Sequence, residues 1–177
     1  VSGCSSDQAS KALATGDLTK LFSPNIWFEI NGAGEVLINI VRAEMGQHVG
    51  TSLAQIVADE LGADWSTVSF KHVDTDPKWG VMVTGGSWSV HTSFTALSQA
   101  GAAGRTILID AAAKLMGVDA QTCRAEKGII SSGTKSLTFA EVVSNGDFSR
   151  TITEDELASM PVKAPADRQV IGRDLRN

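Results

Sequence analysis

Residues 42–62, RAEMGQHVGTSLAQIVADELG, join a strand to a helix through a turn and decide the fold. The turn follows the apolar run of residues 36–41 and centres on Gln47 and His48, which glycines flank. After it, apolar side chains recur at helical intervals, at Leu53, Ile56, Val57 and Leu61. The pattern predicts a strand–turn–helix unit and leaves two interpretations of the turn: an ordinary connection, or a loop shaped to hold a charged group.

The two ends of this helix carry signals of their own. Ser52 and Gln55 stand at capping-box spacing, which predicts that the helix begins close to Ser52. Gly62 suits the left-handed position at which many helices end. The helix is therefore expected to stop at Gly62, shortly before the next strand-like segment.

The segments around this unit predict further strands and a second helix. IWFEI and EVLINI flank NGAG, residues 31–34, as the strands of a β-hairpin would. TVSFKHV, residues 67–73, reads as another strand, and a short hairpin around residues 128–134 precedes a small helix at residues 139–143. Together they predict an α+β fold with β-hairpins and two main helices packed on a sheet.

The longest helical pattern follows TGGSWSV, residues 84–90. Gly101 and Gly104 lower its helix propensity, which indicates that another element packs closely against them. Gly117 is expected to end the helix. The apolar and glycine positions alternate at spacings of three and four along one continuous face: Phe94, Leu97, Gly101, Gly104, Leu108, Ala111 and Leu115.

Three parts of the chain are expected: a processed N-terminus or tether at residues 1–24, a folded domain at 25–145, and an extended arm at 146–177 that links to or packs on a partner chain. The first part is polar, rich in Ser and Ala, and lacks a clear period. The chain begins at Val1 rather than Met, and VSGC resembles a bacterial lipobox, whose cysteine becomes lipidated. We therefore expect an exported protein on the periplasmic side of the cytoplasmic membrane, with Cys4 as the lipidation site; a chance cysteine in a shortened leader is the alternative.

Composition argues against several classes of protein. The formal net charge of −5 and the pI near 5.1 speak against general nucleic-acid binding. Cys4 and Cys123 cannot form a disulfide scaffold or hold an iron–sulfur cluster, and Cys123 is expected to be an inert buried thiol. No metal site is expected from this chain alone, because its histidines lack zinc-ligand spacing: His48, His72 and His91.

Two glycine turns are the best candidates for chemistry. Both precede helices, whose first N–H groups and dipole favour anions such as phosphate. Neither turn matches a P-loop or the GxGxxG fingerprint. Their glycines can adopt positive φ or let the backbone approach a ligand closely: Gly46, Gly50, Gly85 and Gly86. The pair is a candidate anion site, with two tight connections as the alternative.

These turns also resemble a known family. EMGQHVGTSLAQIVADELGADWSTV, residues 44–68, and TGGSWSVHTSFTALSQAGAAGRTILIDAAAKLMGV, residues 84–118, resemble the large subunits of the molybdenum hydroxylases, the xanthine oxidase family. The resemblance is to the N-terminal part of the isoquinoline 1-oxidoreductase β-subunit and to bacterial molybdopterin-dependent aldehyde dehydrogenases. It runs from about Asn25 to Asn177. Residues 25–145 would then be a fragment of a molybdopterin-binding domain.

The resemblance implies a cofactor site at the two turns. In the family, a Gly-Gln-Gly turn and a Thr-Gly-Gly-Ser turn hold a molybdopterin cofactor with molybdenum, in bacteria usually the cytosine dinucleotide form. His48 stands where the second glycine of the first turn is usual, so the backbone approaches the cofactor less closely there, or His48 supplies a contact of its own. The remaining positions match the family by residue: Gly46 and Gln47 in the first turn, and Thr84, Gly85, Gly86 and Ser87 in the second.

The resemblance places the catalytic group outside this chain. The family's base is a glutamate in a Gly-x-Gly-Glu motif near the far carboxyl end. GAGE, residues 32–35, lies in the expected hairpin, so Glu35 is expected to be a turn residue and this chain to hold no catalytic residue. The implied partners are a chain carrying the remainder of the large subunit, a subunit with [2Fe-2S] clusters, and a cytochrome as electron acceptor.

The implied reaction is hydroxylation of a carbon next to a heteroatom, with water as the oxygen source. Oxidation of an aldehyde to a carboxylic acid is the first expectation, and hydroxylation of an N-heteroaromatic ring is the second. The alternative is a non-catalytic structural or cofactor-delivery subunit of the same fold. Gln47 with Gly85 and Gly86 favours a working site, whereas His48 favours the alternative.

Other polar and aromatic residues have simpler interpretations. Glu44 is expected to cap the turn or form an ion pair rather than contact a ligand, and His91 to be packed or capping. Asp59 and Glu60 are expected to be solvated helix charges. Trp88, which follows the second turn, either walls a substrate pocket or packs in the core.

Overall fold

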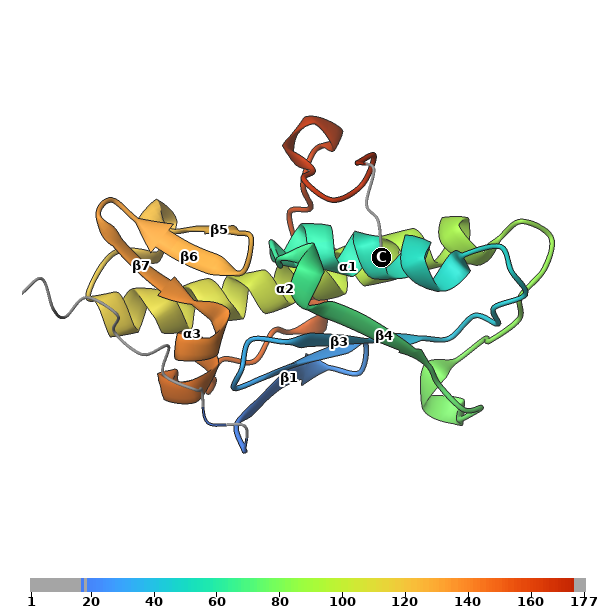
Figure 1. Ribbon diagram of the computed structural model, residues 1–177, viewed down its shortest axis with the longest axis horizontal. Coiled ribbons are helices and arrows are strands. Elements are labelled where there is room, and N and C mark those ends of the chain that lie inside the picture. The colour runs from blue at the N-terminus through green and yellow to red at the C-terminus, as the bar shows by residue number, and fades with distance from the viewer. Residues whose placement is uncertain (1–16, 18, 174–177) are drawn as a thin grey trace, which may run out of the picture.

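The computed structural model describes residue 17 and residues 19–173, and it consists of a sheet with two long helices on one face (Figure 1). The sheet has the strand order β1-β2-β3-β4, and a second sheet has the order β5-β6-β7. The strands are β1 (Leu21–Asn25), β2 (Phe28–Asn31), β3 (Val36–Ile40), β4 (Val68–His72), β5 (Arg124–Glu126), β6 (Ile129–Ser132) and β7 (Lys135–Thr138). The helices are α1 (Val49–Leu61), α2 (Ser89–Met116), α3 (Phe139–Asn145) and α4 (Glu154–Ala158), and short 3-10 turns include η2 (Pro77–Trp79). The expected α+β fold is confirmed.

The first hairpin forms where the sequence predicts it. Strands β2 and β3 pair antiparallel, with Phe28 opposite Ile38. The Asn31 side chain holds the turn, since its Oδ1 accepts from Glu35 N at 3.0 Å and its Nδ2 donates to Glu35 Oε2 at 2.8 Å. Glu35 is therefore a turn residue, as expected.

Helix α1 connects the two parallel strands β3 and β4, whose register places Val36 beside Val68. Parallel neighbours need such a crossover, which puts a helix on the face of the sheet. Alternate residues of β3 are buried against it, and the intervening ones are only half-buried. Strand β1 pairs with β2 at the sheet's edge and begins at Leu21, so part of the segment expected to be a tether belongs to the sheet.

The start of α1 differs from the expectation. The helix begins at Val49, and His48 at its N-cap has the left-handed conformation, with φ 58. Ser52 does not cap the helix: its hydroxyl donates to the His48 carbonyl at 3.1 Å. Gly62 ends the helix as expected, with φ 76.

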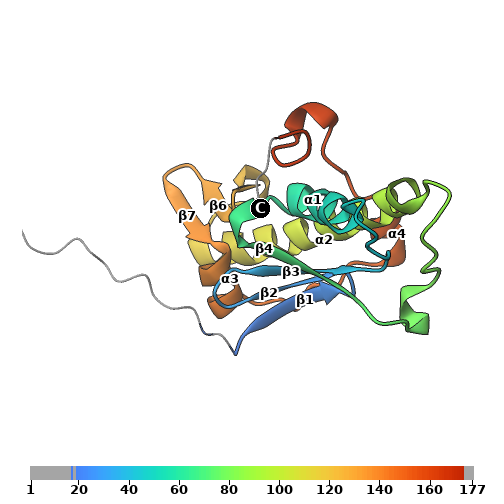
Figure 2. The same cartoon turned by 45° about the vertical axis from the view of Figure 1, so that its right-hand side comes forward.

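Helices α1 and α2 lie side by side over the sheet (Figure 2). The two glycines of α2 make this approach possible. A Cβ on Gly101 would lie 2.8 Å from the Cβ of Glu60 on α1, and one on Gly104 would collide with the ring of Phe28 on β2. The close packing expected from these glycines is confirmed, and Gly117 ends α2 as expected.

The region after α3 is less extended than the sequence predicts. It contains the short helix α4, whose Thr153 and Glu156 form a capping box. The arm then crosses over α1 (Figure 2) and packs on its own domain. The described part of the arm is thus anchored within this chain.

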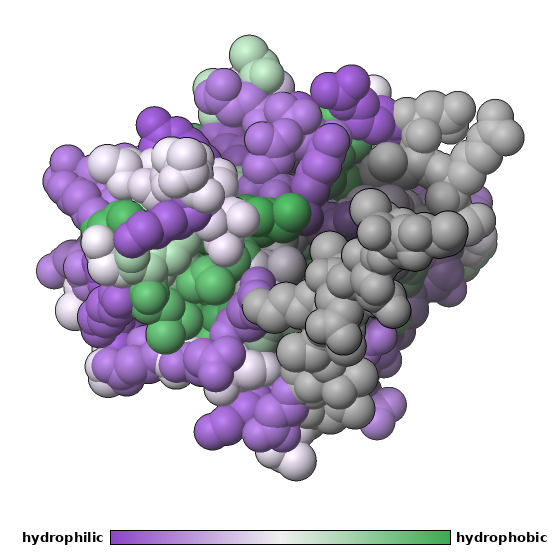
Figure 3. Space-filling view, turned by 60° about the vertical axis from the view of Figure 1, so that its left-hand side comes forward, coloured by the Kyte–Doolittle hydropathy of each residue, from purple (hydrophilic) through white to green (hydrophobic). Residues whose placement is uncertain are grey.

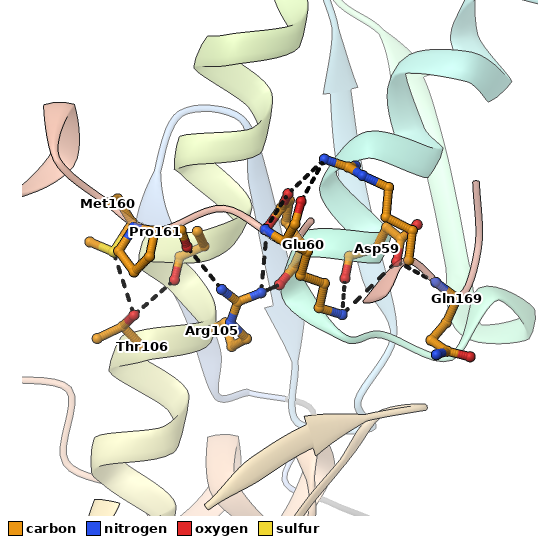
Figure 4. Close-up of polar contacts among 10 residues, drawn as sticks. Asp59, Glu60, Arg105, Thr106, Met160, Pro161 and Gln169 are labelled. Carbon is orange, nitrogen blue, oxygen red and sulfur yellow. Dashed lines mark hydrogen bonds and ion pairs between the residues drawn. The ribbon is translucent and has the colours of Figure 1, made fainter. Parts of the chain in front are cut away.

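Asp59 and Glu60 hold this arm, and the expectation that they are solvated is wrong. Their relative exposures are 1% and 0%. Asp59 accepts the backbone N–H groups of Gln169, Val170 and Ile171 at 2.8 to 3.2 Å (Figure 4). Glu60 accepts from Lys163 N and is paired with two guanidinium groups, those of Arg105 and Arg168. A buried carboxylate is tolerated where such partners satisfy it.

The far end of the molecule, around β5 to β7, has a mainly hydrophilic surface with a limited apolar area (Figure 3). Leu115, near the end of α2, and Ile129 on β6 are its large exposed apolar side chains. In the described part of the chain, no helix has the length and apolar character needed to span a bilayer.

Candidate functional site

The two glycine turns lie side by side at the end of the molecule where α1 and α2 begin, at the right of Figure 1. The backbone N–H of Ala43, just before the first turn, donates to Thr84 Oγ1 at 2.8 Å. Thr84 opens the second turn, so this hydrogen bond joins the two turns directly. The structure thus brings together the two segments that the sequence singled out.

Arg42 fixes the loop that leads into the second turn. Its Nη1 donates to the carbonyl oxygens of Val81 and Val83 at 3.0 and 2.6 Å. Its Nη2 donates to Thr92 Oγ1 at 3.0 Å, in the first turn of α2. Arg42 is buried, and the guanidinium group supplies several donors in a rigid plane, so one residue ties β3, the loop and α2 together.

The start of α1 already holds an anion, the carboxylate of Glu44. Its Oε1 accepts from Gly46 N at 2.8 Å and His48 N at 3.0 Å, and its Oε2 accepts from Gly50 N at 3.4 Å. Desolvation alone would raise the pKa of Glu44, but the backbone hydrogen bonds from His48, Gly50 and Gly46 outweigh it and hold the pKa below its usual value. The capping role expected for Glu44 is confirmed.

The side chain of Gln47 also faces its own loop. Its Oε1 accepts from Met45 N at 2.6 Å, and its Nε2 donates to Ala43 O at 2.9 Å. An amide group keeps one further N–H and one further lone pair in this arrangement. Gly46, with φ 92, and His48 are exposed, and a Cβ on Gly46 would meet nothing within 4 Å.

The second turn is open by comparison. Trp88 N donates to Gly85 O at 3.2 Å, and the two residues between them, Gly86 and Ser87, have φ 58 and 61, as a type I′ turn requires. Trp88 at the N-cap makes no side-chain capping hydrogen bond to α2. The first N–H groups of a helix have no acceptor within it, so this helix start is the better place for an external anion.

A cavity of about 470 Å³ lies beside the second turn. Gly85 and Trp88 line it from the turn, and Trp27 and Trp79 line it from the sheet side and from η2. Trp88 is 67% exposed, so it is a surface residue at the cavity and does not pack in the core.

The other candidate residues have clear positions. Cys123 is buried and free, as expected. His91 is exposed on the first turn of α2, so the expectation of a packed histidine is wrong. Cys4 lies outside the described residues, and its lipidation stays a prediction.

Sequence reasoning missed Arg42, Trp27 and Trp79. Arg42 had one usable signal, because a charged residue directly after a buried strand needs partners. The two tryptophans had none, since they are 52 residues apart and only the fold brings them together.

The site partly fits an anionic, phosphate-bearing cofactor. The second turn offers an uncapped helix start, and Gly85 has open space where a Cβ would stand. At the first turn, the backbone donors are engaged by Glu44. A cofactor at these turns would therefore receive backbone donors from the second turn and side-chain contacts from the first.

Comparisons with known proteins give similar proteins of one kind. The chain is 48% identical over 151 residues to the membrane-bound aldehyde dehydrogenase [pyrroloquinoline-quinone] of Gluconacetobacter polyoxogenes, covering 85% of this chain and 20% of that protein. It is 31% identical over 157 residues to the isoquinoline 1-oxidoreductase β-subunit of Brevundimonas diminuta, covering 80% and 20%. It is 33% identical over 133 residues to a subunit of the nicotinate dehydrogenase of Pseudomonas putida, covering 73% and 11%. The chain thus spans a fifth or less of the length of these relatives.

The fold has a counterpart among solved structures. The crystal structure of quinoline 2-oxidoreductase from Pseudomonas putida 86 superposes with a TM-score of 0.52 at 24% identity, over 66% of this chain and 15% of that chain. The family model described as the molybdopterin cofactor-binding domain matches residues 5–166. With most of its length in that match, the chain belongs to the molybdopterin cofactor-binding domain family.

Proposed function

We propose that this chain supplies part of the cofactor site of a molybdopterin-dependent oxidoreductase that hydroxylates a carbon next to a heteroatom with water. Oxidation of an aldehyde to a carboxylic acid is the first candidate reaction, and hydroxylation of an N-heteroaromatic ring is the second. The observation that carries the proposal is the hydrogen bond between Ala43 and Thr84, which joins the two turns in a domain of this family. The names of the relatives support both reactions, and the aldehyde dehydrogenase has the highest identity of the three.

Each turn has a distinct part in the proposed site. The second turn would take the anionic phosphate groups at the uncapped start of α2, where the helix dipole favours negative charge. The first turn would contact the cofactor through the free N–H and lone pair of Gln47 and through the exposed His48. When bound, the molybdenum cofactor, in its cytosine dinucleotide form, supplies the two-electron oxidation. The residues assigned to cofactor binding are Gly46, Gln47, His48, Thr84, Gly85, Gly86 and Ser87, with Trp88 at the substrate pocket.

The remaining parts of the enzyme are proposed to lie on partner chains. These are the rest of the large subunit with its catalytic glutamate, a subunit with [2Fe-2S] clusters and a cytochrome acceptor. Exposed apolar side chains gather around the two turns, as a covered interface requires: Met45, Val81, Val83, Trp88, Val90 and Phe94. The periplasmic side of the membrane, with lipidated Cys4, is the proposed location, which the membrane-bound relative supports.

A specific observation favours the alternative of a structural or cofactor-delivery subunit. Glu44 and Gln47 both turn inward, so most polar groups of the first turn serve the loop itself. A delivery subunit needs only a loose grip on the cofactor. Turnover by a complex that contains bound molybdenum would favour the enzyme over this alternative.

The test is analysis of the native complex purified through this chain. Metal analysis, extraction of the cofactor and mass spectrometry should find molybdenum, a cytosine-dinucleotide pterin, partner chains and a lipid on Cys4. Aldehyde oxidation with an artificial electron acceptor should accompany the metal. A complex with pyrroloquinoline quinone and no molybdenum would contradict the proposal.

A further inference from the structure

The cavity beside the second turn has the size and lining of a small-molecule pocket. Its volume of about 470 Å³ falls in the range of such sites. Besides Trp27, Trp79 and Trp88, its walls include Val81 and Val83, so apolar surface dominates. We refer to it as the tryptophan pocket.

Three of the four tryptophans in the chain line this one cavity. They come from separate segments: Trp27 from the turn between β1 and β2, Trp79 from η2, and Trp88 from the residue before α2. The rings of Trp27 and Trp79 contact each other, with centroids 6.0 Å apart and an interplanar angle of 48°. Large aromatic faces of this kind favour a third planar ring in an offset or edge-to-face arrangement.

The wall of the pocket is held in place before any ligand binds. Arg42 donates to the carbonyl oxygens of Val81 and Val83, which stand between Trp79 and Trp88 in the chain. A pocket that is already formed avoids the cost of ordering a loop when the ligand binds. Trp79 itself is fixed by its ring contact with Trp27 on the sheet side.

The charges around the pocket favour a neutral ligand. Arg42 is the one charged residue lining it in the described part of the chain, and its guanidinium donates to Val81, Val83, Thr92 and Ser93. A buried cation engaged in this way has little capacity left for a ligand carboxylate. The hydroxyls of Thr92 and Ser93 also line the pocket and suit a neutral polar substituent such as a carbonyl or ring nitrogen.

We propose that the tryptophan pocket binds a neutral planar aromatic ring, so that aromatic aldehydes and N-heteroaromatic compounds form the preferred substrate class. In calling the ring a substrate, the inference rests on the proposed function. The binding itself depends on residues of this chain alone and needs no cofactor.

The test is a calorimetric titration of the full chain with benzamide and with cyclohexanecarboxamide. The two amides carry the same polar group and differ in having a planar or a puckered ring. Benzamide should bind about three- to tenfold more tightly, the range expected for stacked aromatic pairs. Trp79→Leu and Trp88→Leu should each reduce that preference, and circular dichroism melting should establish that both variants are folded.

Trp65→Phe is the matched control, because Trp65 lines a different cavity beside Gly62. It should leave the preference for benzamide unchanged. Equal affinity of the wild-type chain for both amides, absence of binding, or a preference that survives both pocket variants would overturn the inference. A molybdenum-containing, active complex with any of these results would retain the proposed function and lose only this pocket.

Discussion

At the scale of single residues, the carboxylate of Glu44 sets the difference between the two turns. It occupies the start of α1 and accepts from Gly46 and His48, whereas the start of α2 has no comparable side-chain acceptor at its N-cap. An internal anion and a bound phosphate compete for the same donors. We therefore assign external anions to the second turn.

Glu44→Gln should lower the melting temperature at neutral pH by a few degrees. The pKa of Glu44 lies below its usual value of 4.5 in the folded protein, so the carboxylate stabilises the fold above that pH. This contribution is lost as the pH falls through the folded-state pKa, and the difference between variant and wild type should shrink there. Melting curves from pH 7 to pH 3 test this, with Glu154→Gln on α4 as the control. A difference that is constant with pH would contradict the role of the charge.

Gly86→Ala separates cofactor contact from backbone strain. Gly86 has φ 58, and Gly133, in the turn between β6 and β7, has φ 59, so alanine is equally strained at both. Each variant should lose about 1 kcal/mol of stability, measured by urea unfolding. In the assembled complex, Gly86→Ala alone should lower molybdenum content and turnover. Equal losses in the two variants would mean that strain, and no contact with the cofactor, explains the effect.

At the scale of elements, α1 carries the first turn at one end and the arm at the other. Asp59 and Glu60 in its last turn would be solvated on an isolated helix, and their spacing gave no sign of burial. Only the return of residues 163–171 over α1 covers them. The strands, the two main helices and both glycine stops were predictable because their periods are local, whereas these contacts join segments more than 100 residues apart.

Asp59→Ala should destabilise the chain by about 3–5 kcal/mol, because it leaves three backbone donors and the nearby Lys163 without their acceptor. Urea unfolding measures this, and limited proteolysis should cut the arm between residues 160 and 173 earlier than in wild type. Asp74→Ala in an exposed loop is the control and should stay within about 0.5 kcal/mol. An arm that remains protected in Asp59→Ala would show that other contacts hold it.

At the scale of the whole molecule, the candidate site lies at one end, among exposed apolar side chains such as Met45 and Val81. The sequence predicted the two turns through their glycines and the family resemblance. It could not predict that the turns touch or that Gln47 folds inward, since both depend on how β3, α1 and α2 meet. The tryptophan pocket was out of reach for the same reason.

The 177-residue chain on its own should be inactive and bind no molybdenum, because the proposed catalytic glutamate and the remaining walls of the cofactor site belong to partner chains. An assay with an aldehyde and an artificial electron acceptor, together with metal analysis, tests this. The assembled complex is the positive control. Turnover by the pure chain would contradict the division of the site.

Molybdenum content of the assembled complex carrying Gly85→Val tests the central claim, that the two turns hold the cofactor, most directly. Gly85 has no positive φ, and a Cβ there would meet nothing within 4 Å, so valine should leave the melting temperature unchanged. Only a cofactor lying against the second turn would collide with the new side chain. We expect loss of most of the molybdenum from a complex as stable as wild type, whereas a complex that keeps its full molybdenum content would contradict the claim.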